Sequence, residues 1–186
     1  EAREEWWEAE VIRTTDPLAR LSLTISLIAL SKSPMPSELK KGIDQAIDLV
    51  QQGKLEQAKA VCETLGQKVG EQTTLLFLQG AIAIKSGAPG EAVPYLRRAI
   101  ALAPDELHYR KILADVLFDQ GETEDAIYHY RRILAIAPNS LGVICRSAQC
   151  LKRLGRIDDA ITSLRMALSL NPAHPIAGLE MARILR

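Results

Sequence analysis

The sequence predicts an all-α fold, a solenoid built from antiparallel helix pairs, and three recurring features support this prediction. Proline follows an apolar, helix-like run at Pro104, Pro138 and Pro172, so both intervals are 34 residues. Glycines recur at the same interval, and an alanine follows each of them by five residues. A fixed period of this length is the sequence signature of a repeat protein, in which stacked supersecondary units share one continuous core.

The period divides the chain into four units with a segment at each end. The units are residues 39–72, 73–106, 107–140 and 141–174. Within them a small residue, a glycine and an alanine recur in register, at Ala46, Gly80, Ala114 and Ala148, at Gly53, Gly87, Gly121 and Gly155, and at Ala58, Ala92, Ala126 and Ala160. Residues 1–38 are predicted to form an N-terminal helical segment, which the period also fits as a degenerate repeat. Residues 175–186 are predicted to form a C-terminal capping helix or the first helix of a fifth repeat.

Each unit is predicted to be a helix, a tight turn and a second helix. In the third unit Leu107, Leu113 and Leu117 fall on one face of a helix. Gly121 ends that helix, because glycine enters the left-handed conformation without a Cβ clash. The next stretch, ETEDAIYHYRRILAIA, is acidic at its start and basic later, as the helix dipole favours, and Pro138 ends it.

Two residues depart from this pattern. Gly70 stands where the later units have proline, and glycine also ends helices. Pro94 falls inside the second helix of the second unit. Because an interior proline breaks a helix, that helix must start near Pro89, which leaves Pro94 close to its first turn.

These recurring positions resemble the consensus of the tetratricopeptide repeat family across residues 39–174. The resemblance implies a right-handed superhelix with a concave groove, lined by the first helices of the units. It also implies a non-catalytic scaffold that binds a peptide or a partner segment in that groove. The groove residues expected from the resemblance are Phe77, Ile84, His108, Lys111, Asp115, Phe118, Gln149, Lys152, Arg153, Leu179 and Arg183.

The expected groove is apolar toward its N-terminal end and basic toward its C-terminal end. Residues 141–186 carry seven Lys and Arg against three Asp and Glu. A partner with an apolar anchor and an acidic segment would match this gradient through charge-assisted hydrogen bonds. The alternative is that these are solvated helix charges of little energetic weight. A clamp for chaperone tails, which some family members carry, is disfavoured because Asp115 and Arg146 stand where that clamp uses asparagine.

Composition disfavours several other classes of protein. The formal net charge is zero and aromatic residues make up only 4% of the chain, so a nucleic-acid partner is not indicated. Three cysteines without a CxxC pair fit a reducing, cytoplasmic setting. The most apolar stretch, Leu18–Leu30, is too short for a transmembrane helix. No catalytic set, metal site or cofactor is predicted, because the three histidines are far apart in sequence and GAPGE lacks the lysine of a phosphate loop.

The N-terminal segment leaves several alternatives open. LSLTISLI alternates like a half-buried strand, but a helix buried on more than one side is favoured, because a lone strand beside helices has no partner. This apolar stretch, or Trp6 and Trp7, could fill the apolar end of the groove or form a homo-oligomer interface through residues 1–38. The chain could also continue beyond residue 186, as the repeat region of a larger glycosyl- or sulfotransferase.

Overall fold

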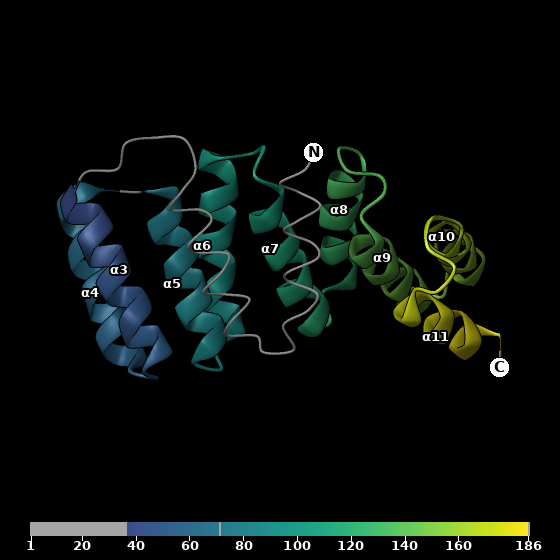
Figure 1. The fold of residues 1–186 in the computed structure, drawn as a ribbon, viewed down its shortest axis with the longest axis horizontal. Helices are drawn as coiled ribbons and strands as arrows, with labels where there is room; N and C mark the ends of the chain where they lie inside the picture. The colour runs from purple at the N-terminus through teal and green to yellow at the C-terminus, as the bar shows by residue number, and fades with distance from the viewer. Residues whose placement is uncertain (1–36, 71, 186) are drawn as a thin grey trace. The chain divides into compact units, whose positions relative to one another are not determined.

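The computed structural model describes residues 37–70 and 72–185, and all regular structure within them is α-helical (Figure 1). The helices are α3 (Ser37–Gln51), α4 (Leu55–Val69), α5 (Thr73–Lys85), α6 (Pro89–Leu102), α7 (Leu107–Asp119), α8 (Thr123–Leu134), α9 (Leu141–Arg153), α10 (Ile157–Leu170) and α11 (Pro175–Ile184). The predicted all-α fold is therefore confirmed. The predictions for Trp6, Trp7 and Leu18–Leu30 lie outside the described residues.

The described part of the chain forms two compact units, one ending at residue 102 and the other beginning at residue 103. In the first unit α3 pairs with α4 and α5 with α6, and in the second unit α7 pairs with α8 and α9 with α10. Helix α11 packs against both α9 and α10. Within residues 37–70 and 72–185, each unit therefore holds two helix pairs, and the second unit adds one further first helix.

The turn inside each pair has one recurring geometry, which the glycine permits. After α7, Gly121 has φ +87° and its N–H donates to the Phe118 carbonyl at 3.1 Å. The next N–H, of Glu122, donates back to the Leu117 carbonyl at 2.8 Å. These two bonds make a Schellman motif, which satisfies carbonyls that the end of the helix would otherwise leave unpaired. The other three pairs repeat both bonds at the same spacing.

Replacing Gly121 with alanine is expected to lower the free energy of unfolding by about 1–2 kcal/mol, because the left-handed conformation brings Cβ close to the following carbonyl. Nothing lies within 4 Å of a Cβ added there, so backbone strain is the only cost. Gly142→Ala is the matched control, since Gly142 lies inside α9, also in open space. This variant should raise the free energy of unfolding by about 0.5–1 kcal/mol, because alanine is the better helix former. Chemical denaturation measures both, and equal effects of the two variants would contradict the assigned turn.

Small residues bring the two helices of each pair close together. Ala114 in α7 and Ala126 in α8 are both fully buried, and the equivalent residues of the other pairs are buried as well. At Gly80 an added Cβ would lie 3.3 Å from Cγ of Leu96, tighter than an ordinary contact. Dense packing of this kind leaves no room for a larger side chain.

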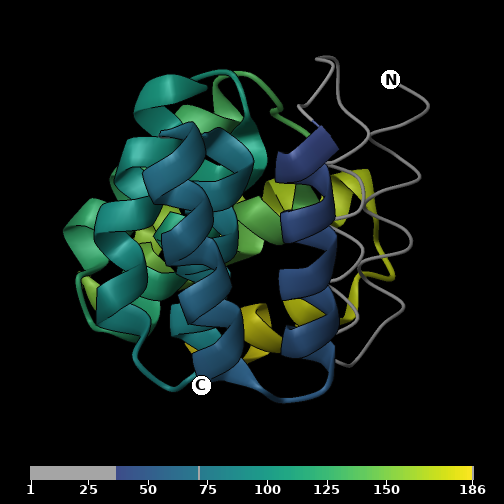
Figure 2. The ribbon, with the colours of Figure 1, turned by 90° about the vertical axis from the view of Figure 1, so that its left-hand side faces the viewer.

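Helix α5 is apolar on nearly every side because it has neighbours on nearly every side. It packs against α3, α4 and α6 (Figure 1, Figure 2). Four consecutive side chains, from Leu75 to Leu78, are accordingly buried. Helix α6 begins at Pro89, as the position of Pro94 requires. The backbone hydrogen bond that Pro94 cannot donate is therefore lost near the start of the helix and not at its centre.

Candidate functional site

Polar side chains of α7, α9 and α11 contact one another in the second unit. We call this group the first-helix network, because α7 and α9 are the first helices of their pairs and α11 follows them as a further first helix. Its members are Lys111, Asp115, Arg146, Gln149, Lys152, Arg153, Glu180 and Arg183. Five of the eight are cations and two are carboxylates, so the network carries an excess of positive charge.

Asp115 is the acceptor at the α7 end of the network. Its Oδ2 accepts from Nζ of Lys111 at 2.9 Å, and its Oδ1 accepts from the hydroxyl of Tyr130 at 2.5 Å. Nε of Arg146, on α9, lies 3.7 Å from Oδ1. Tyr130 is fully buried, and burial together with the Asp115 charge raises the pKa of its hydroxyl far above the usual value. The hydroxyl is therefore a fixed donor, which orients the carboxylate.

Glu180 is the acceptor at the α11 end, and it is only 6% exposed. Its Oε1 accepts from Nε2 of Gln149 at 3.2 Å and from Nη1 of Arg183 at 2.9 Å, and Nζ of Lys152 lies 4.0 Å from Oε2. A buried carboxylate is costly unless it is paired and hydrogen-bonded, and these three side chains supply that pairing. Glu180 thereby ties α11 to α9.

Arg153 joins α9 to the C-terminal end of α7. Its Nη1 donates to the Phe118 carbonyl at 2.6 Å, and its guanidinium carbon lies 3.6 Å from the centroid of the Phe118 ring. In the first unit Lys85 donates to the Val50 carbonyl, which again precedes it by 35 residues. A cation at this position therefore satisfies a carbonyl at the end of the preceding first helix in both units.

His108 and Cys145 lie near the network, and their pKa values are shifted so that both side chains are neutral at pH 7. Burial lowers the pKa of His108 to about 4, so its contact with Glu106, 3.4 Å away, is not an ion pair at pH 7. Burial, with the Glu180 charge, raises the pKa of Cys145 to about 11. Sγ of Cys145 lies 3.9 Å from Nδ1 of His174, which also accepts the Ala177 N–H at 3.2 Å as the N-cap of α11. Cys145 is thus a thiol beside a helix cap and not a thiolate nucleophile.

The structure brings together six of the groove residues expected from the sequence. These are Lys111, Asp115, Gln149, Lys152, Arg153 and Arg183, all in the first-helix network, and Phe118 contributes its ring and carbonyl. His108 lies half-buried at the start of α7, and Leu179 on α11 is 52% exposed. Phe77 and Ile84 belong to α5 in the first unit, where Phe77 is fully buried and Ile84 partly exposed.

Sequence reasoning missed three members of this site. Arg146 and Glu180 are 34 residues apart and occupy the same position of the repeat. That position holds Leu78 in the repeat 73–106 and Ile112 in the repeat 107–140. The available signal was that charged residues replace the apolar residues of the second and third repeats, although the first repeat also has a charged residue, Asp44, at this position. Nothing in the spacing of Tyr130 shows that its hydroxyl reaches Asp115 on the other helix of the pair.

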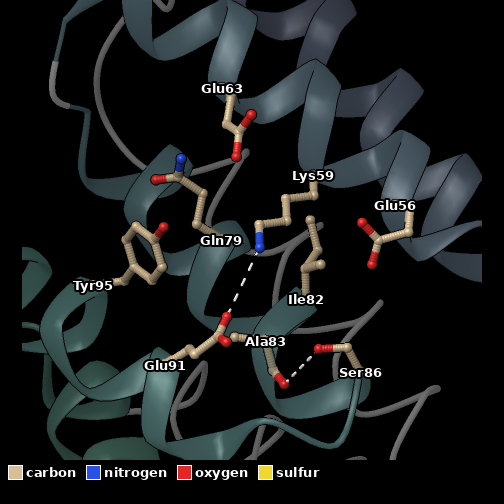
Figure 3. Close-up of a pocket in the computed structure, with 9 residues that line it drawn as sticks. All are labelled: Glu56, Lys59, Glu63, Gln79, Ile82, Ala83, Ser86, Glu91 and Tyr95. Carbon is tan, nitrogen blue, oxygen red and sulfur yellow. Dashed lines mark hydrogen bonds and ion pairs between the residues drawn. The ribbon is translucent and has the colours of Figure 1, made fainter.

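A shallow pocket in the first unit lies between α4, α5 and α6 (Figure 3). Its polar lining includes Glu56, Lys59 and Glu63 of α4 and Glu91 of α6. Lys59 points toward Glu91 at 3.8 Å, but both side chains are about half exposed. An exposed ion pair of this kind contributes only about 0.2–1 kcal/mol, so this pocket is a weaker candidate than the network.

Two further searches cover only residues 37–70 and 72–185. In that part of the chain no group of three His, Cys, Asp or Glu side chains is placed to hold a metal ion. None of the helices described there is long and apolar enough to cross a membrane.

Comparison with known families gives three matches to models described as tetratricopeptide repeat. Two cover residues 43–106 and 77–140, and a third covers residues 117–184. Together they cover residues 43–184, which include every described helix except the first six residues of α3. No curated protein matches the chain.

Solved structures of MamA share the fold. One from AMB-1 has a TM-score of 0.68 at 23% identity, covering 79% of this chain and 80% of that one. MamA residues 41 to the end from Desulfovibrio magneticus RS-1 has a TM-score of 0.74 at 14% identity, covering 81% and 85%. Identities this low establish similarity of fold alone, and they agree with the predicted all-α solenoid of helix pairs.

Proposed function

This chain belongs to the tetratricopeptide repeat family, and on that premise we propose that it is a non-catalytic scaffold that binds an extended segment of a protein partner. The segment lies along the first helices of the second unit, on the first-helix network. Binding needs no cofactor and no chemical step, because a preformed surface is sufficient.

The observation that supports this proposal is the ordering of charges across three helices. Asp115 and Glu180 each hold a set of donors in place, and Arg153 is held by the ring and carbonyl of Phe118. Side chains that are ordered before binding lose less conformational entropy when a partner arrives. A surface fixed in this way is suited to recognition.

The sign of the charge indicates the chemistry of the partner. Five cations face two carboxylates in the network, so a cationic segment would be repelled and an acidic one attracted. Leu179, 52% exposed on α11, adds an apolar contact beside Arg183. We therefore propose a partner segment with acidic residues and at least one apolar side chain.

Pools of degenerate 12-residue peptides, about 40 Å long when extended, test this proposal by fluorescence anisotropy. One pool holds two fixed glutamates at its centre and the other two fixed lysines. We expect the glutamate pool to bind and the lysine pool not to bind. In the variant Lys152→Glu with Arg153→Glu, we expect at least a tenfold loss of affinity for the glutamate pool, equivalent to about 1.4 kcal/mol.

The matched control reverses the same number of charges elsewhere. Arg131→Glu with Arg132→Glu changes two exposed cations of α8 and should leave binding unchanged. Circular dichroism checks that both double variants keep their helices. If neither peptide pool binds, or if both variants lose affinity equally, the first-helix network is not the binding surface.

A second copy of the chain is a further candidate partner. Residues 1–16 carry six acids against two arginines, opposite in sign to residues 141–186. A synthetic peptide of residues 1–16 can be added to the same assay, and its binding would support self-assembly through the N-terminal segment. No described residue bears on the alternative of a repeat region within a larger transferase.

The cysteines support a reducing compartment, and we propose the cytoplasm. Cys62, Cys145 and Cys150 are all free and buried. Burial raises the pKa of each thiol to about 11 or 12, so all three remain protonated and behave as small apolar side chains.

A further inference from the structure

We infer that the partner segment carries a phosphorylated side chain, and that Arg146 and Arg153 bind its phosphate together beside the ring of Phe118. This inference rests on the proposed function, since it concerns the same surface. It goes further by naming the group that is recognised and the two residues that recognise it.

The two guanidinium groups converge on one aromatic ring. The guanidinium carbon of Arg153 lies 3.6 Å from the Phe118 centroid, and that of Arg146 lies 5.3 Å from it. Both arginines project from α9, two helical turns apart, toward the same residue of α7. Stacking on an aromatic ring fixes the plane of a guanidinium and leaves its N–H edges available.

Neither arginine is hydrogen-bonded to a carboxylate among the described residues, although Arg146 forms a long ion pair with Asp115. Arg153 donates one N–H to a backbone carbonyl and pairs with no described carboxylate. Nε of Arg146 is 3.7 Å from Asp115, which is beyond hydrogen-bond length, and its Nη1 reaches Gln149 only at 3.5 Å. Lys111 and Arg183 differ, because each bonds a carboxylate at 2.9 Å, whereas Lys152 lies 4.0 Å from Oε2 of Glu180.

A phosphate suits this pair better than a carboxylate does. A carboxylate brings one charge and two oxygens, and it must compete with Asp115 for Arg146. A phosphate monoester carries close to two negative charges at pH 7 and three acceptor oxygens, so it can bond both guanidinium groups at once. Arginine also matches phosphate with two parallel N–H bonds, which a lysine cannot form.

Three pools of degenerate 12-residue peptides, identical except at one central position, test the inference on the full chain. That position holds phosphoserine, glutamate or serine. We expect the phosphoserine pool to bind at least tenfold more tightly than the glutamate pool, and the serine pool to bind most weakly. Inorganic phosphate should displace the phosphoserine pool, and chloride at equal ionic strength should not.

Conservative variants separate the effect of the two parallel N–H donors of arginine from the effect of its charge. Arg146→Lys with Arg153→Lys keeps both charges and should bring phosphoserine binding down to the level of glutamate. Arg131→Lys with Arg132→Lys, on α8, is the matched control and should change nothing. Because Arg153 also bonds a backbone carbonyl, Arg146→Lys alone provides a variant that leaves that bond intact, and it should lose most of the preference for phosphoserine.

The outcomes distinguish this inference from the proposed function. If the glutamate pool binds as tightly as the phosphoserine pool, the phosphate preference is overturned and an acidic partner still stands. If the lysine variants keep the preference, Arg146 and Arg153 are not the recognising residues. If no pool binds, the proposed function itself fails.

Discussion

Replacing Tyr130 with alanine is expected to lower the free energy of unfolding by about 3–5 kcal/mol, the usual cost of truncating a fully buried aromatic side chain. Tyr130 has no exposed surface and is the largest of the fully buried side chains. Its removal would leave a cavity between α7 and α8 and would also take a donor from Asp115. Chemical denaturation, followed by circular dichroism, measures the loss.

Tyr130→Phe separates the hydrogen bond from the packing. The ring remains, but Asp115 loses the hydroxyl, and a hydrogen bond to a charged group contributes about 1.5–3 kcal/mol. Lys111 still holds Asp115 at 2.9 Å, so a value at the lower end is expected. Tyr128→Ala is the control, because Tyr128 is 58% exposed and a surface change of this kind costs within about 0.5 kcal/mol. Equal losses for the Tyr128 and Tyr130 alanine variants would contradict the assigned core.

Helices and turns could be predicted from the sequence because local rules decide them. Gly121 requires the left-handed conformation, and Gly142, inside α9, does not, yet their neighbours in the sequence already distinguish them. Gly121 follows an apolar helical run and recurs at every period, whereas Gly142 recurs nowhere. Periodicity therefore distinguishes the two roles from the sequence alone.

The polar site could be predicted only in part, because its contacts join helices that are distant in sequence. Lys111 with Asp115 is an i, i+4 pair that a helix alone brings together. Gln149 and Glu180 are 31 residues apart in the sequence. Whether these two polar side chains meet depends on how α11 packs against α9. The family resemblance predicted which helix face carries these residues. Only the packing of α11 shows that Glu180 is buried.

Replacing Ala148 with leucine is expected to lower the free energy of unfolding by about 1–3 kcal/mol, because overpacking a tight contact forces neighbouring atoms apart. Ala148 is 1% exposed in α9, where α9 packs against α10. The added side chain must push α10 away or leave its preferred rotamer. Thermal unfolding at a lower temperature, with the helical signal of the native state unchanged, would show this.

Ala182→Leu makes the same substitution at the same register, 34 residues later in α11. No described helix covers this side of α11, and Ala182 is exposed. Leucine is nearly as good a helix former as alanine, so this variant should change stability by no more than about 0.5 kcal/mol. These two results would show that the small residue is required by the second helix that packs on it and not by the first helix that carries it. If both leucine variants were equally stable, the small residues would not be the points of close approach, and the repeat would owe its period to the turns alone.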